Sequence, residues 1–215
     1  MKEMYYFVFW MLLSACSVEA NAKEKVSLDD VPMSFSIQDD FDSTRLDSVL
    51  NAHVDRIRSF AQKKGSQYST NKAILVDMKI PSNYFRLFVV DLNTRKILAK
   101  GMCAHGQGSE IYGTDSLQFS NVPNSYMTSL GMYKIGKSYV GSFGKSYKLY
   151  GLESTNSKAY DRAIVLHSYS CVPDDEQKET ICNSLGCIMV SENFKNELIP
   201  YIEGESKALL MDVYY

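Results

Sequence analysis

The sequence has few cysteines, little net charge and no long hydrophobic run. Five cysteines among 215 residues are too few for a disulfide scaffold that replaces a hydrophobic core. A net charge of −2 provides no basic surface, which excludes nucleic acid as the default partner. Hydrophobic residues make up 45% and charged residues 22% of the chain, which excludes a disordered protein. The length suits one ordinary domain with a short appendage.

An apolar run near the N-terminus indicates export. Residues 5–13 are all apolar or aromatic, a run too short for a bilayer-spanning helix of about 20 residues and typical of a signal-peptide core. Leu13-Ser14-Ala15-Cys16 follows, the pattern of a bacterial lipoprotein signal in which Cys16 is acylated and anchors the chain without spanning the membrane. The alternatives are cleavage after Ala22, which would free a soluble protein, and a buried strand. We expect residues 1–22 to be a signal peptide and the protein to be periplasmic or in the cell envelope.

The remaining chain divides into a tether, a helix and a strand-rich domain. Residues 23–42 are polar and acidic, as expected for a tether. Apolar residues recur every three or four positions over 43–64, which predicts an amphipathic helix that forms the segment 43–72 with its linker. Residues 73–215 contain short apolar runs rich in Tyr, Phe, Val and Ile.

These runs predict a mostly β domain, a sandwich or partly open barrel, with a short helix after Ser191. No internal repeat is visible. The predicted strands are residues 73–78, 84–91, 96–104, 131–136, 145–149, 162–167 and 209–214.

Two segments carry the candidate catalytic residues. Residues 163–166 form an apolar strand that ends at His167, and Ser184-Leu-Gly-Cys187 is a turn of mostly small residues before the apolar run 188–190. A Gly before a nucleophile lets backbone N–H groups converge where an oxyanion would form. If the intervening loop folds back and His167 meets Cys187, the imidazole can take the thiol proton.

These segments resemble the L,D-transpeptidase catalytic domain, the YkuD-like family of peptidoglycan enzymes. The family is characterised by a His followed, at a spacing like this one, by a Ser/Thr-His-Gly-Cys turn. Here 16 residues separate His167 from Ser184. The resemblance is densest to the murein L,D-transpeptidase branch of exported bacterial proteins and covers about residues 73–215. The segments that carry it are residues 86–92, 104–108, 119–125, 129–131, 149–152 and 162–167.

Two positions depart from the family pattern. Leu185 stands in place of the His before Gly-Cys, and residues 188–190 lack the Arg commonly found after the Cys. Both departures resemble the Ser-x-Gly-Cys form of the murein branch. We expect His105, in the turn 104–108, to fill part of the space of the missing His. The alternative for His105 is a turn residue that bonds to the backbone.

The resemblance implies a mixed β fold and a Cys nucleophile that acts on peptidoglycan stem peptides without a cofactor. Cys187 would attack the carbonyl before a terminal D-Ala, and His167 would take the thiol proton and pass it to the leaving amine. Backbone N–H groups of Gly186 and Cys187 would hold the oxyanion, and a carbonyl near Ser168 would orient His167. Further candidates for substrate contact or support are Ser184, His105, Gly106, Ser120 and Asn121.

Three alternatives to transpeptidation remain open. Water as the acceptor would make the protein a carboxypeptidase or endopeptidase with the same nucleophile. A catalytically dead lipoprotein could bind peptidoglycan through the same groove. A papain-like hydrolase is the third, although in that class the Cys precedes the His along the chain. We expect a monomer in each case.

The remaining features to interpret are the other cysteines and the question of a metal site. Cys171 and Cys182 bracket an acidic loop, and outside the cytoplasm we expect a disulfide that stabilises the fold by about 2–3 kcal/mol. Two buried thiols, or pairing with Cys103, are the alternatives. Cys103 lies in a strand-like run and suits a small buried hydrophobe. The cysteine spacings lack the paired pattern of zinc sites, so no metal is expected.

Overall fold

The computed structural model describes residues 43–215, with side chains from residue 47 onward. The predicted signal peptide at residues 1–22, its lipidation candidate Cys16 and the predicted tether at 23–42 lie outside the described residues. Within the described range, no helix combines the length and the apolar character needed to cross a bilayer.

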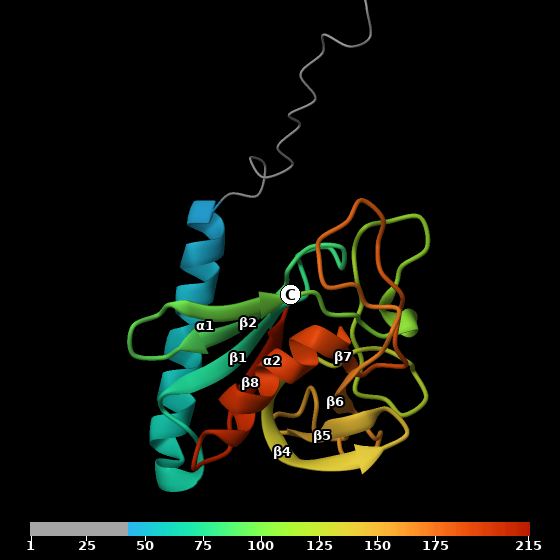
Figure 1. Ribbon diagram of the computed structural model, residues 1–215. Coiled ribbons are helices and arrows are strands. Elements are labelled where there is room, and N and C mark those ends of the chain that lie inside the picture. The colour runs from blue at the N-terminus through green and yellow to red at the C-terminus, as the bar shows by residue number, and fades with distance from the viewer. Residues whose placement is uncertain (1–42) are drawn as a thin grey trace, which may run out of the picture. The chain divides into compact units, whose positions relative to one another are not determined.

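Eight strands form one mixed sheet in the order β3-β2-β1-β8-β4-β5-β6-β7 (Figure 1). The last strand pairs parallel with β1 and antiparallel with β4, so the C-terminal residues join two halves of the sheet. This architecture, with one helix near the start and one after the Cys187 turn, confirms the predicted mixed β fold. The strands are β1 (Lys72–Asp77), β2 (Leu87–Asp91), β3 (Ile97–Gly101), β4 (Gly131–Gly141), β5 (Gly144–Gly151), β6 (Val165–Ser168), β7 (Ile188–Val190) and β8 (Leu210–Tyr214).

The first helix, α1 (Ser43–Lys63), matches the predicted amphipathic segment. Its buried residues recur every three or four positions, which places them on one side of the helix. They are Leu50, Val54, Ile57 and Ala61. This stripe packs with side chains from β1, β2 and β8, which form one of the two large hydrophobic clusters.

The second helix, α2 (Glu192–Glu203), covers the other face of the sheet. It begins after Ser191, whose hydroxyl accepts a hydrogen bond from the Phe194 N–H over 3.1 Å, as an N-cap does. Its buried side chains join the largest cluster together with Ile74, whereas the neighbouring Leu75 belongs to the cluster under α1. Because successive strand residues point to opposite faces, the two helices sandwich the sheet.

The β4–β5 hairpin is longer than the sequence predicted. Polar and glycine residues at 136–138 interrupt the apolar pattern, and the pairing shifts register between Ile135 and Ser138. The outer half of β4 is largely exposed, so it needs no apolar alternation to form a strand. The tip of this hairpin carries Phe143.

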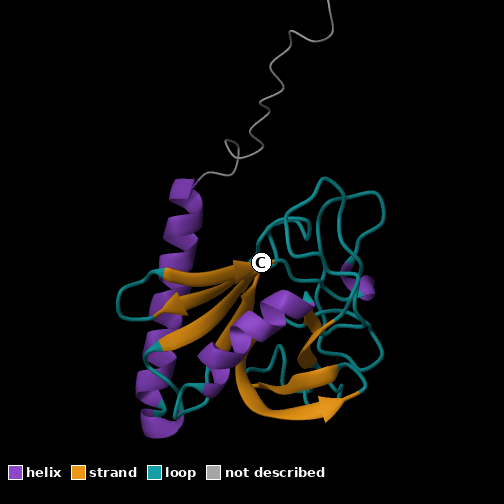
Figure 2. Cartoon of the chain, viewed as in Figure 1, coloured by secondary structure: helices purple, strands orange, loops and turns teal. Residues whose placement is uncertain are grey.

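Long connections replace regular structure between the strands that follow β3. Residues 102–130, 152–164 and 169–187 contain only turns, isolated bridges and the short helix η2 (Gln107–Ser109). Figure 2 shows these loops gathered beside the end of the sheet formed by β6 and β7. Loops on a rigid scaffold are where binding and catalytic residues concentrate.

Candidate active site

The parallel pairing of β6 and β7 places the residue after Cys187 beside the strand that carries His167. Leu166 pairs with Ile188, and His167 pairs with Met189. Leu166 and Ile188 both belong to the largest hydrophobic cluster. By strand alternation His167 and Met189 share the other face, and Cys187 lies in the turn directly before β7. The loop folds back as the sequence analysis required.

His167 is held in one tautomer. Its ring Nδ1 lies 3.0 Å from the Ser168 carbonyl oxygen, which can only accept, so Nδ1 carries the proton and Nε2 can receive one. The ring stacks on Phe143, with centroids 4.1 Å apart. Burial lowers the pKa of His167, against the opposing effect of the Ser168 carbonyl. The residue is therefore a neutral, oriented base at neutral pH.

The Cys187 thiol faces a backbone carbonyl. Its Sγ donates to the Ala163 oxygen over 3.8 Å, and among the described residues no hydrogen bond joins it to His167. Burial raises the pKa of Cys187, while the Val165 backbone and the Arg162 charge act in the opposite direction. The net upward shift favours the neutral thiol over the thiolate. Hydrogen bonds of this kind often tighten only when substrate is bound.

The turn before Cys187 is closed by Ser184. The Ser184 hydroxyl donates to the Cys187 carbonyl over 2.8 Å and accepts from the Gly186 N–H over 3.1 Å. Gly186 has a φ of +112°, and a Cβ there would come within 2.8 Å of the Met127 carbonyl, so only glycine fits. For the Gly186 N–H to donate to an oxyanion, its hydrogen bond to the Ser184 hydroxyl would have to break.

Gly106 supports this turn from the neighbouring loop. Its N–H donates to the Thr128 hydroxyl over 2.9 Å. A Cβ on Gly106 would lie 2.8 Å from the Gly186 nitrogen, so the two backbones pack directly against each other. Gly106, one of the predicted candidates, therefore supports the turn through its backbone, which packs closely against that of Gly186.

Arg162 was missed as a site residue by the sequence analysis. Its guanidinium donates to the Ser120 carbonyl over 2.8 Å and the Met127 carbonyl over 2.6 Å. Its charge lowers the pKa of Cys187 and so favours the thiolate. The predicted candidates Ser120 and Asn121 fix the loop: Ser120 binds Arg162, and the Asn121 amide donates to the Ser154 carbonyl over 3.0 Å.

The side chain of His105 is buried beside Arg86. Its side chain is 5% exposed, and its Nδ1 lies 2.9 Å from Nη2 of Arg86. In the described part of the chain, no hydrogen bond or ion pair connects this side chain to Cys187 or His167. Only its backbone reaches the turn, since its carbonyl accepts from the Ser184 N–H over 2.8 Å.

Cys171 and Cys182 form the predicted disulfide, with Cα atoms 6.0 Å apart. Cys103 is buried with a free thiol, which excludes its pairing with either of them. Burial raises the pKa of Cys103 to about 11. Across residues 43–215, no cluster of three His, Cys, Asp or Glu residues could hold a metal ion.

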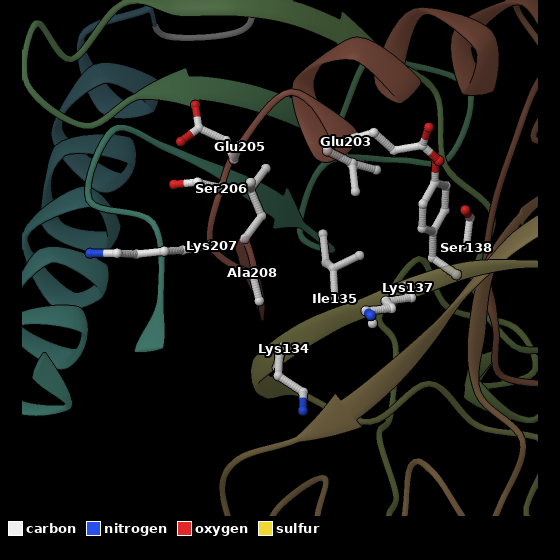
Figure 3. Close-up of a pocket in the computed structure, with 13 residues that line it drawn as sticks. Lys134, Ile135, Lys137, Ser138, Glu203, Glu205, Ser206, Lys207 and Ala208 are labelled. Carbon is white, nitrogen blue, oxygen red and sulfur yellow. The ribbon is translucent and has the colours of Figure 1, made fainter. Parts of the chain in front are cut away.

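A pocket of about 570 Å³ lies apart from these residues (Figure 3). Its lining comes from β4, β5 and the chain around and after the end of α2, and includes neither cysteine nor histidine. Its carboxylates are already paired: Glu203 with Lys145 over 2.7 Å, and Glu205 with Lys72 over 2.6 Å. The pocket offers no nucleophile or base for the chemistry considered above.

A family profile described as the L,D-transpeptidase catalytic domain matches residues 46–211, which includes most of α1, the strands β1 to β7 and the start of β8. No curated protein matches the sequence.

Several solved structures are similar in fold. An L,D-transpeptidase from Xylanimonas cellulosilytica is 15% identical with a TM-score of 0.41, over 68% of this chain and 61% of that one. Bd1075 of Bdellovibrio bacteriovorus is 17% identical with a TM-score of 0.43, over 69% and 51%. A variant of the helical cell shape determining protein Pgp2 from Campylobacter jejuni is 13% identical with a TM-score of 0.45, over 76% and 55%. The matched regions thus span 51% to 61% of these proteins.

Proposed function

Because the chain belongs to the L,D-transpeptidase catalytic-domain family, we propose that it is a cell-wall enzyme that transfers acyl groups between peptidoglycan stem peptides through a thioester on Cys187. One observation carries the proposal. It is the parallel pairing of β6 and β7, which sets His167 opposite Met189, two residues after Cys187; the bond of His167 Nδ1 to the Ser168 carbonyl supports the role of Nε2 as proton acceptor.

The first step activates the thiol. Rotation of the Cys187 side chain away from the Ala163 carbonyl brings the S–H to Nε2 of His167, which takes the proton. The thiolate, favoured by the Arg162 charge, attacks the carbonyl that precedes a terminal D-Ala. The Cys187 N–H faces the oxyanion, and the Gly186 N–H joins it if Ser184 releases it; one such donor contributes about 3 kcal/mol.

The second step releases D-alanine. The tetrahedral intermediate collapses, the C–N bond breaks, and His167 gives its proton to the leaving amine. An amine of a second stem then attacks the thioester and loses a proton to His167, which returns it to the sulfur. The products are a new amide bond and the restored thiol. Water in place of the amine gives a shortened stem instead.

Product analysis tests this proposal. The protein is incubated with disaccharide-tetrapeptides, and the products are identified by mass spectrometry. Cross-linked dimers are the expected result, whereas tripeptides alone would assign hydrolysis. Neither product, from protein shown to be folded, would contradict acyl transfer and favour a peptidoglycan-binding role.

The proposed location is the cell envelope. It rests on family membership and on the signal pattern at residues 1–22, with Cys16 as the lipid anchor. Fractionation of cells that express the chain and its Cys16→Ala variant tests the anchor. Membrane association should be lost in the variant; release of both forms into the soluble fraction would favour cleavage after Ala22.

A further inference from the structure

A second cavity of about 570 Å³ lies away from the proposed catalytic residues. Its lining falls mainly in residues 78–84 and 110–117, and Arg86, His105 and Thr180 complete it. Neither the Cys187 turn nor β6 contributes to this lining. The cavity is therefore distinct from the site of acyl transfer.

The buried Arg86 determines the state of His105. The guanidinium is completely buried, and its Nε donates to the Cys103 carbonyl over 2.6 Å and its Nη1 to the Ile80 carbonyl over 3.2 Å. A guanidinium has only donors, so the His105 Nδ1, 2.9 Å from Nη2, must accept. Burial, together with the Arg86 charge, lowers the pKa of His105 to about 4. The ring is therefore neutral at pH 7, with its proton on Nε2.

This Nε2–H has no acceptor. It is buried and has no hydrogen-bond partner among residues 47–215. The Glu110 carboxylate is 3.7 Å away, beyond hydrogen-bond distance. Buried polar groups are nearly always paired, and an unpaired donor on the wall of a cavity calls for an acceptor oxygen from a ligand.

A second unpaired atom lies next to Glu110. The Asn183 amide donates to the Glu110 carboxylate over 2.7 Å, which fixes the orientation of the amide. Its Oδ1 is buried and also lacks a partner within the described chain. Beside Glu110, the His105 Nε2–H donor and the Asn183 Oδ1 acceptor are thus both left without a hydrogen-bond partner.

The charges of the lining restrict the ligand further. The lining contains Lys79 and Arg86 as well as Glu110 and Asp115, so the four formal charges cancel. A lone carboxylate bound at His105 would be repelled by Glu110, which is close to the same Nε2. A ligand that also carries a cation beside its carboxylate avoids this repulsion.

We propose that this cavity binds an α-amino acid group, whose carboxylate accepts from His105 Nε2–H and whose ammonium pairs with Glu110. A free amino acid and the amino acid end of a stem-peptide side chain both present this group. The site is independent of the proposed acyl transfer, because it needs neither Cys187 nor His167.

Calorimetric titration tests the ligand class. The full chain with Cys187→Ala is titrated with D-alanine and with a stem tripeptide whose diaminopimelate side chain ends in a free amino acid group. N-acetyl-D-alanine lacks the ammonium, and D-alaninamide lacks the carboxylate. Binding of D-alanine, with both capped forms at least about tenfold weaker, supports a free amino acid as ligand. Binding of the tripeptide alone assigns the stem, and binding of neither probe overturns the proposal.

Variants locate the binding. His105→Asn keeps an oxygen for Arg86, but its shorter amide does not extend to the position of Nε2, and Glu110→Gln removes the carboxylate charge. Each should weaken binding of the active probe about tenfold, with the fold verified by amide NMR spectra. Glu197→Gln, at an exposed α2 position outside the lining, is the matched control and should bind normally. Unchanged affinity in both cavity variants overturns the proposal. Absence of transpeptidation in a protein that still binds D-alanine would contradict the proposed acyl transfer and leave this binding site unaffected.

Discussion

Two regions of this chain each contain one thiol and one imidazole, and their neighbours give these groups opposite properties. At the β6–β7 edge, His167 donates from Nδ1 to the Ser168 carbonyl, so its Nε2 is an acceptor. In the second cavity, His105 accepts at Nδ1 from Arg86, so its Nε2 is a donor. Cys187 is partly exposed, whereas Cys103 is completely buried.

The difference teaches that the hydrogen bond on one ring nitrogen sets the role of the other. A carbonyl next to His167 produces a proton acceptor, which suits general base catalysis. A guanidinium next to His105 produces a neutral donor that suits recognition of an oxygen. Both regions contain a Cys and a His, and the hydrogen-bond partner of the imidazole differs between them.

The largest expected difference between the regions concerns the thiols. Cys187→Ala should lower product formation by at least about 1000-fold, because the proposed thioester cannot form. Cys103→Ala should retain activity within a few-fold, because that thiol is buried and its pKa is raised to about 11. Chromatography of products from disaccharide-tetrapeptides measures both. Comparable losses of activity in the two variants would contradict the proposed difference between the two thiols.

The next effect concerns the base. His167→Gln removes the proton acceptor and should lower turnover by about 100- to 10,000-fold. The matched control is His53→Gln, since His53 lies on α1 and bonds to Asp212 rather than to the site. Initial rates across pH 5–9 provide the measurement. A His167→Gln enzyme with an unchanged rate and pH profile would remove His167 from the mechanism.

The pH dependence of the free energy of unfolding tests the neutral state assigned to His105. Its pKa is lowered from 6.5 to about 4, so the unfolded chain binds more protons between these values and stability falls as pH falls through that window. The full shift corresponds to about 3 kcal/mol. His105→Asn does not titrate and should show a shallower decline in urea unfolding between pH 7 and pH 4. Burial lowers the pKa of His167 as well, so part of the slope should remain. Identical slopes in wild type and variant would contradict the assigned state of His105.

The smallest predicted effect concerns the loop between the regions. The Cys171–Cys182 disulfide closes residues 172–181, and this loop contacts the segment next to Arg86 through the Asn83 amide, which donates to the Gln177 carbonyl over 2.8 Å. Replacement of both cysteines by serine should lower the free energy of unfolding by about 2–3 kcal/mol. Denaturation with and without a reducing agent measures this, and the double variant should not respond to the agent. A wild-type protein equally unresponsive would argue against the bond.

Local patterns of the sequence predicted the elements that depend on near neighbours. The period of the α1 stripe predicted a helix over 43–64, where the structure has Ser43–Lys63, and the start of α2 after Ser191 was also predicted. The strands β2 and β3 fall within the predicted strands 84–91 and 96–104 and pair with each other. Sequence order did not reveal that β8 lies between β1 and β4, because strand pairing at that separation depends on the packing of the whole sheet.

The candidate site, like the fold, was predictable from the sequence only where it depends on local patterns. The spacing of His167 and Ser184 and the family resemblance pointed to His167 on β6 and to Cys187 in the turn before β7. The neighbours that set their properties come from distant loops: Phe143 stacks on His167 from a hairpin tip, and Arg162 reaches the Ser120 loop. The tautomer of His105 likewise depends on Arg86, whose contact with it exists only after β2 and β3 have paired.

The central claim is that Cys187 receives the acyl group. Wild-type protein is mixed briefly with a stem tetrapeptide without acceptor, quenched in acid and digested, and the fragment that contains Cys187 is analysed by mass spectrometry. We predict a gain equal to the tetrapeptide minus D-alanine, located on Cys187 and removed by hydroxylamine, with none on Cys103. An adduct on another residue, or turnover by the Cys187→Ala variant at the wild-type rate, would contradict the account.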